Sequence, residues 1–222
     1  MRIRSIVPVL VLSTAACAGT SSPPQASQPQ ASAPPLSAEA IEAGIRTGGM
    51  RNEPYSRADV EFMTGMIAHH AQAVVMAGWA PSHGASDGLQ RYCERIVVGQ
   101  RDEIGLAMDW LGERDEPLPD PAMAAHGHAM PGMDHGMLMP GMLTAAQMAE
   151  LDAARGIEFD RLFLQYMIMH HEGALAMVDE LFKSYGAAQD EFIFKFANDV
   201  FADQSSEITR MQAMLDALSS GG

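Results

Sequence analysis

An internal repeat constrains this chain more than any other feature. Residues 59–76 (DVEFMTGMIAHHAQAVVM) align without a gap with residues 160–177 (DRLFLQYMIMHHEGALAM), at an offset of 101 (160 minus 59). Downstream, the pattern Gln-x-x-Glu-Ile begins at Gln100 and again at Gln204. Self-similarity of this kind indicates a repeated supersecondary unit, here a pair of helices. Two helix pairs can bury their apolar faces on each other, so we predict an all-α fold, a four-helix bundle.

Apolar periodicity locates the helices of these two pairs. Apolar residues recur with a helical period from Val60 to Ala77, after a capping box that Ser56 opens and before a breaker at 81–88. Three further main helices are expected at about 89–111, 157–184 and 189–218. Shorter helices are expected at 37–45 and after a second capping box at Thr144. No segment shows the alternation that is typical of a strand.

The N-terminus has the pattern of an export signal. A basic start at Arg2 and Arg4 precedes a short apolar run, which ends in Ala-Ala-Cys17. We expect residues 1–16 to be a lipoprotein signal peptide and Cys17 to carry a lipid anchor that faces the periplasm or the cell exterior; a plain signal peptide is the alternative. Residues 17–49 follow as a predicted Ala/Ser/Pro/Gln tether. The bundle domain is expected over 50–222, with 115–143 as a long loop that carries five prolines.

Charge and cysteine content narrow the classes of function. The formal net charge of -14 argues against binding to a phosphate backbone, which needs a basic surface, so no nucleic-acid partner is expected. The chain has two cysteines, and lipidation of Cys17 would leave Cys93 without a disulfide partner. We interpret Cys93 as a small buried apolar residue in preference to a metal ligand.

Both repeats carry the pattern Met-x-x-His-His, with a second Met six residues after the His pair. Burying four imidazoles would require a polar partner for each ring, so packing alone explains this pattern poorly. The predicted metal ligands are Met66, His69, His70, Met76, Met167, His170, His171 and Met177. Four polar residues of the partner helices could orient the imidazoles or could be ordinary solvent-facing side chains: Gln100, Glu103, Gln204 and Glu207. We expect Asp59 and Asp160 to cap helix starts.

A second concentration of Met and His lies in the long loop. Nine of the twenty residues 123–142 are Met or His, and this stretch has no apolar stripe that a core could bury. Thioether and imidazole donors together suit Cu(I), and imidazole also suits Cu(II), whereas a zinc site would leave the methionines unused. A low-complexity insertion is the alternative. The predicted loop ligands are His126, His128, Met130, Met133, His135, Met137 and Met139.

At the two Met-Ile-x-His-His motifs the chain resembles the domain of unknown function 305 family. Both repeats match the family pattern Asp-x-x-Phe-x-x-x-Met-Ile-x-His-His-x-x-Ala-x-x-Met, and the resemblance covers about residues 50–217. It implies a ferritin-like four-helix bundle. It also implies export and, for some members, periplasmic copper binding through the repeated Met and His residues.

Three functions remain open on the sequence alone. The first is a binding protein without catalysis that sequesters or delivers copper, with Cu(I) favoured over Cu(II) or Ag(I). Its partners would be the metal ion, the membrane through the lipid anchor, and a second copy or a copper-trafficking protein. The second is a ferritin-like metal-dependent oxidase, for example a cuprous oxidase; a di-iron site is disfavoured because the chain has no Glu-x-x-His motif. The third is a structural or interaction module without metal.

Overall fold

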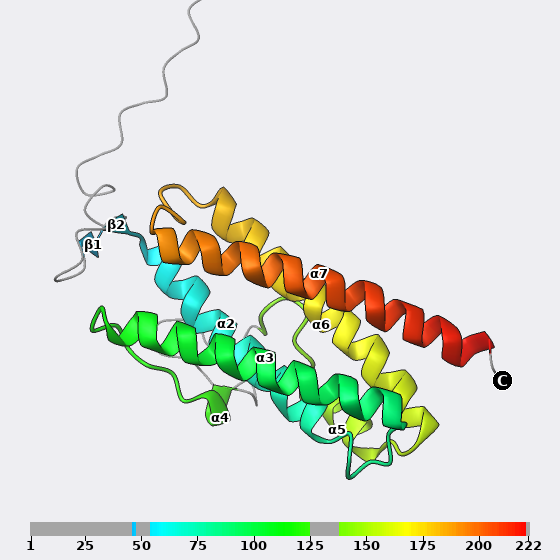
Figure 1. Cartoon of the computed structure of the whole chain (residues 1–222). Coiled ribbons are helices and arrows are strands. Elements are labelled where there is room, and N and C mark those ends of the chain that lie inside the picture. The colour runs from blue at the N-terminus through cyan, green and yellow to red at the C-terminus, as the bar shows by residue number, and fades with distance from the viewer. Residues whose placement is uncertain (1–45, 48–53, 125–137, 221–222) are drawn as a thin grey trace, which may run out of the picture. The chain divides into compact units, whose positions relative to one another are not determined.

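The computed structural model describes residues 46–47, 54–124 and 138–220, and this part of the chain is helical (Figure 1). A two-residue antiparallel pair, β1 (Arg46–Thr47) and β2 (Pro54–Tyr55), precedes the helices and is too short to carry an alternating pattern. The helices are α2 (Arg57–Gly78), α3 (Asp87–Gly112), α4 (Pro121–Ala124), α5 (Ala145–Ala153), α6 (Ile157–Lys183) and α7 (Glu191–Ser220).

The four long helices form two hairpins, α2 with α3 and α6 with α7, and α2 packs against α6 (Figure 1). The predicted all-α class is confirmed, and the helix bounds agree with the periodicity to within two residues. Both predicted capping boxes are present, at Ser56 with Asp59 and at Thr144 with Gln147. The ferritin-like description and the helix at 37–45 stay predictions, the latter because it lies outside the described residues.

The loop at 115–143 contains a short helix that was not predicted. The short helix α4 lies inside it and packs against α2. Asp120 accepts a hydrogen bond from the backbone N–H of Ala122 at 2.9 Å, and Pro121 occupies the first helical position, where its missing N–H costs nothing. A single helical turn buries no periodic stripe, so apolar periodicity could not reveal it.

Apolar side chains form two clusters, one on each side of the histidine pairs. The first cluster contains Phe62 and Met66 of α2 together with Ala174 of α6, and Met177 packs against it. The second cluster contains Phe163 and Met167 of α6 together with Ala73 and Met76 of α2. The beginning of each repeat therefore shares a cluster with the end of the other, as expected when two copies cross in opposite directions.

The aspartate at the start of each repeat accepts hydrogen bonds from the loop of the other helical hairpin. Asp59 accepts a hydrogen bond from the N–H of Ser56 at 2.7 Å and a second from the N–H of Ala188, in the α6–α7 loop, at 2.8 Å. Asp160 accepts hydrogen bonds from the N–H of Ser86, in the α2–α3 loop, at 3.1 and 3.2 Å. Asp59 has the capping role that was predicted, whereas the Asp160 carboxylate binds the partner hairpin.

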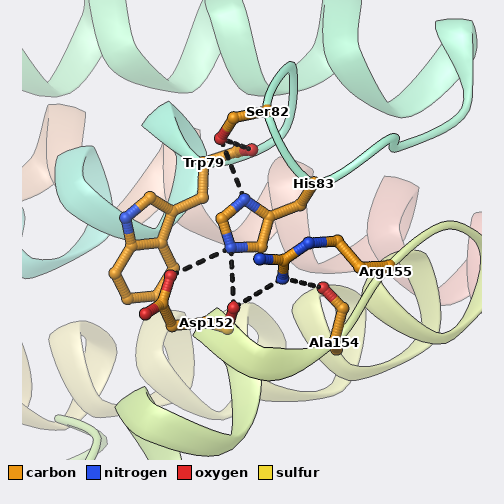
Figure 2. A network of polar contacts seen from close by, with 6 residues as sticks. All are labelled: Trp79, Ser82, His83, Asp152, Ala154 and Arg155. Carbon is orange, nitrogen blue, oxygen red and sulfur yellow. Dashed lines mark hydrogen bonds and ion pairs between the residues drawn. The ribbon is translucent and has the colours of Figure 1, made fainter.

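A second link joins the α2–α3 loop to α5, and Figure 2 shows it around the buried His83. His83 Nε2 donates to the carbonyl oxygen of Asp152 at 2.9 Å and lies 3.0 Å from its carboxylate. His83 Nδ1 lies 2.9 Å from Ser82 Oγ, and the ring stacks on Trp79. Ser82 Oγ also donates to the Trp79 carbonyl, so the network holds the conformation of the loop.

The end of the long loop passes directly over the crossing of α2 and α6. Gln72 of α2 exchanges two hydrogen bonds with the backbone of Leu143, at 2.7 and 3.1 Å. At the matching position of the other repeat stands Gly173, where an added Cβ would lie 2.0 Å from the carbonyl oxygen of Pro140. Gly141 has a φ of +75°, and an added Cβ there would lie 2.5 Å from the carbonyl oxygen of Met169 in α6. The repeat thus departs from its symmetry where the loop contacts it.

This close approach predicts the effect of a single methyl group. We expect Gly173→Ala to lower the free energy of unfolding by about 1–3 kcal/mol, because the loop backbone must move away from α6. The control is Gly105→Ala in α3, where nothing lies within 4 Å of the new Cβ. That substitution should stabilise the protein by about 0.5–1 kcal/mol. Urea unfolding of both variants measures the difference, and equal effects would contradict the close contact.

Candidate metal centre

The four repeat histidines lie together inside the protein. His69 and His70 of α2 and His170 and His171 of α6 each have an exposed fraction of 0%. The rings of His69 and His170 are in contact across the helix crossing, with centroids 3.8 Å apart and planes tilted by 40°. Each ring lies about 6 Å from its sequence neighbour (6.3 Å in α2, 6.2 Å in α6). The repeat therefore brings all four imidazoles into one cluster.

Three of these rings have their Nε2 atom directed at an oxygen. His69 Nε2 lies 3.0 Å from the carbonyl oxygen of Pro140, at the end of the long loop. His171 Nε2 lies 2.6 Å from the Glu207 carboxylate of α7. His70 Nε2 lies 2.7 Å from the matching Glu103 carboxylate of α3, although that contact does not have hydrogen-bond geometry. A neutral ring that donates from Nε2 carries a lone pair on Nδ1.

Six ring nitrogens of the cluster have no hydrogen-bond partner among the described residues. These are Nδ1 of His69 and His171, and both nitrogens of His70 and His170. Leaving a buried polar atom unsatisfied costs about 1–3 kcal/mol, so several together require an explanation. An imidazole that donates from Nε2 to a carboxylate or carbonyl, and offers a free Nδ1, has the arrangement typical of metal-binding histidine.

Burial also fixes the protonation state of the two rings in contact. Removal from water lowers the pKa of His69 from 6.5 to about 3, and the neighbouring His70 lowers it further. Burial likewise lowers the pKa of His170 well below its ordinary value, with added repulsion from the other three histidines. Both rings are therefore neutral at pH 7, and a metal ion that binds their lone pairs need not displace a proton.

Methionine thioethers flank the cluster on both sides. Met66 and Met167 precede the His pairs by one helical turn and, like Met76, are fully buried, whereas Met177 is half-buried. All four lie in or against the apolar clusters. Burial is expected both for a methionine that only packs in the core and for one that binds metal, so their role as ligands stays a prediction. Among the described residues, no three His, Cys, Asp or Glu side chains are placed to hold a metal ion by themselves. The donors gathered here are imidazole and thioether.

The other predicted residues fall into three groups. The loop ligands His126, His128, Met130, Met133, His135 and Met137 lie outside the described residues, and Met139 is half-buried at the point where the description resumes. Gln100 and Gln204 are buried, and neither amide has a hydrogen-bond partner in the described part of the chain. Cys93 is free and buried in the second cluster, as predicted.

Sequence reasoning missed Gln72 and Pro140, which anchor the loop beside the cluster. A main-chain carbonyl has no residue-type signature, so the Pro140 contact could not be foreseen. The exchange of Gln72 for Gly173 between otherwise similar repeats was the available signal.

Comparison with known proteins identifies the family to which this chain belongs. The family model described as a domain of unknown function, DUF305, matches residues 59–215, which is more than half of the chain. The chain belongs to the DUF305 family. This confirms the resemblance carried by the two Met-Ile-x-His-His motifs. No curated protein matches this DUF305 chain.

Solved structures share the fold of this DUF305 protein. A DUF305 protein from Streptomyces coelicolor is 27% identical, with a TM-score of 0.60, and the match covers 73% of this chain and 94% of that one. CopM in its Cu(II)-bound form is 28% identical, with a TM-score of 0.55 and coverage of 72% and 96%. CopM in its Cu(I)-bound form is 26% identical, with a TM-score of 0.54 and the same coverage.

The buried neutral histidines predict how stability depends on pH. In the unfolded chain His69 takes up a proton near pH 6.5, whereas in the folded protein its pKa is about 3. The unfolded state thus binds more protons between these values. The stabilisation is complete above pH 6.5 and is lost as the pH falls. We expect His69→Gln to reduce the slope of the unfolding free energy between pH 6 and 4 by about 1.4 kcal/mol per pH unit. Urea unfolding of the metal-free protein measures it, and an unchanged slope would show that the ring is protonated in the folded state.

Proposed function

We propose that this DUF305 protein is an exported copper-binding protein that sequesters or delivers the metal without catalysing a reaction. The observation that carries the proposal is the cluster of four buried histidines, in which six ring nitrogens have no hydrogen bond to a described residue. Structural likeness to CopM, which has been solved with Cu(I) and with Cu(II) bound, supports copper as the metal.

The donor set favours Cu(I). Neutral imidazole and thioether are soft ligands that suit a monovalent polarizable ion, and silver(I) shares this preference. His69, His70, His170 and His171 would supply nitrogen, and Met66, Met76, Met167 and Met177 would supply sulfur. A zinc or di-iron site would use His, Cys, Asp or Glu ligands, and among the described residues no three such side chains are placed to hold an ion.

The Met/His-rich loop would capture copper and pass it inward. The described end of this loop contacts His69 through the Pro140 carbonyl and α2 through Leu143. The predicted ligands at 126–139 directly precede this anchored segment in the sequence, and a short tether would raise the local concentration of a captured ion near the cluster. Exchange between loop and cluster donors of the same chemical type would complete the transfer.

Export is supported by the basic and apolar N-terminal sequence that ends at Cys17, and by likeness to the Streptomyces coelicolor protein, a candidate secreted protein. Lipidation of Cys17 would hold the domain at the membrane surface through the tether at 17–49. Among the helices that the structure describes, none has the length and apolarity needed to cross a bilayer.

The histidine cluster can be tested with one substitution and a matched control. We expect His170→Gln to weaken Cu(I) binding by the full chain at least about tenfold, because it removes a central donor. The control, His83→Gln, changes a buried histidine whose nitrogens already bind Ser82 and Asp152. Competition titration with a Cu(I) chelator measures affinity, and circular dichroism checks folding. Wild-type affinity in a folded His170→Gln protein would exclude the cluster.

The loop needs a separate test because it can bind metal by itself. Replacement of His126, His128, Met130, Met133, His135, Met137 and Met139 by Ala should lower the number of Cu(I) ions bound per chain. The cluster donors remain, so at least one ion should still bind with wild-type affinity. Metal analysis after gel filtration gives the stoichiometry, and an unchanged value would remove the loop from the mechanism.

A further inference from the structure

A pocket of about 220 Å³ opens between α3 and α7, on the side of the histidine cluster where the two glutamates lie. Glu103 and Glu207 line it, and each also contacts a cluster histidine, His70 and His171 respectively. Their side chains are 17% and 22% exposed, so they connect solvent with rings that are fully buried. The pocket therefore leads to the cluster from outside.

Two buried amides of the pocket lining have no partner. Gln100 of α3 is 3% exposed and Gln204 of α7 is 1% exposed, and both line the pocket. Neither the oxygen nor the nitrogen of either amide makes a hydrogen bond within the described chain. Four unsatisfied buried atoms at matching positions of the repeat point to an occupant that offers hydrogen bonds.

The charge of the pocket selects a cation. Three carboxylates line it, from Glu103, Asp203 and Glu207, against the single guanidinium of Arg95. Partial burial raises the pKa of Asp203, and repulsion from Glu103 and Glu207 raises it further. Carboxylates that repel one another in a shared concavity attract positive ions strongly.

We propose that this pocket binds a hydrated divalent cation and is the port through which a divalent ion reaches the histidine cluster. The described carboxylates and imidazoles do not converge closely enough to hold a bare ion, so the ion would keep its waters. The volume of about 220 Å³ has room for an ion with about six waters, at roughly 30 Å³ each. Those waters donate hydrogen bonds to the carboxylates and to the amide oxygens of Gln100 and Gln204.

The onward path follows from the same contacts. Glu103 and Glu207 each face the pocket and a ring nitrogen of the cluster, so an ion that sheds water between them meets His70 and His171 next. This step rests on the proposed copper function, with Cu(II) as the ion that enters here. Binding in the pocket itself does not depend on copper.

The test compares two charge-neutralising substitutions on α7 of the full chain. Asp203→Asn changes an exposed side chain of the pocket, whereas the carboxylates that pair with the described cluster histidines are those of Glu103 and Glu207. Asp216→Asn removes the same charge from the same helix about 20 Å away. Mn(II), which prefers oxygen donors, is the binding probe and is followed by electron paramagnetic resonance. The rate at which Cu(II) quenches tryptophan fluorescence reports entry.

We expect Asp203→Asn to weaken Mn(II) binding by about tenfold and to slow Cu(II) entry, with Asp216→Asn close to wild type. Cu(I) affinity at equilibrium should be the same in all three proteins. Equal Mn(II) affinity in the two variants would overturn the cation site, and equal Cu(II) rates would overturn the entry role. Mn(II) binding that depends on Asp203, in a protein that takes up no Cu(I), would support the pocket and contradict the copper function.

Discussion

The contact between His69 and His170 is the constraint on which the rest of the structure depends. It lies where the two hairpins cross. The two imidazoles and those of their neighbours His70 and His171 are fully buried there. Protein atoms alone leave much of this core's hydrogen-bonding capacity unused, because six ring nitrogens have no hydrogen bond to a described residue. Binding to those lone pairs would offset that deficit, so the same residues that weaken the empty core would drive metal uptake.

The surroundings of the cluster differ on its two sides. On one side the Met/His-rich loop ends against His69, Gln72 and Gly173. The donors predicted for this loop are sulfur and nitrogen. On the other side the pocket between α3 and α7 presents carboxylate and amide oxygen. Soft donors suit a monovalent ion and oxygen donors suit a hydrated divalent ion. The two helix pairs thus form a near-symmetric core that is open to different chemistry from each side.

Local signals allowed most of the fold to be predicted. Capping boxes at Ser56 and Thr144 and the apolar period placed the helix starts, and the repeat predicted that the two His pairs would meet. The Pro140 carbonyl contact, the Gln72–Leu143 pair and the Asp160–Ser86 link could not be predicted, because each joins segments about seventy residues apart and leaves no periodic trace. The repeat shows Glu103 and Glu207 at matching positions. That each side chain contacts both solvent and an imidazole depends on how α3 and α7 pack, which the sequence does not reveal.

Nitrogen-15 NMR of the histidine rings in the full chain decides whether the buried cluster binds metal, with Ag(I) as a diamagnetic substitute for Cu(I). One equivalent of Ag(I) should shift the ring nitrogens of His69 and His170, while His83, bound to Ser82 and Asp152, stays unchanged. Shifts confined to His126, His128 and His135 would contradict binding by the cluster, because they would place the metal in the loop and leave the buried cluster as a purely structural core.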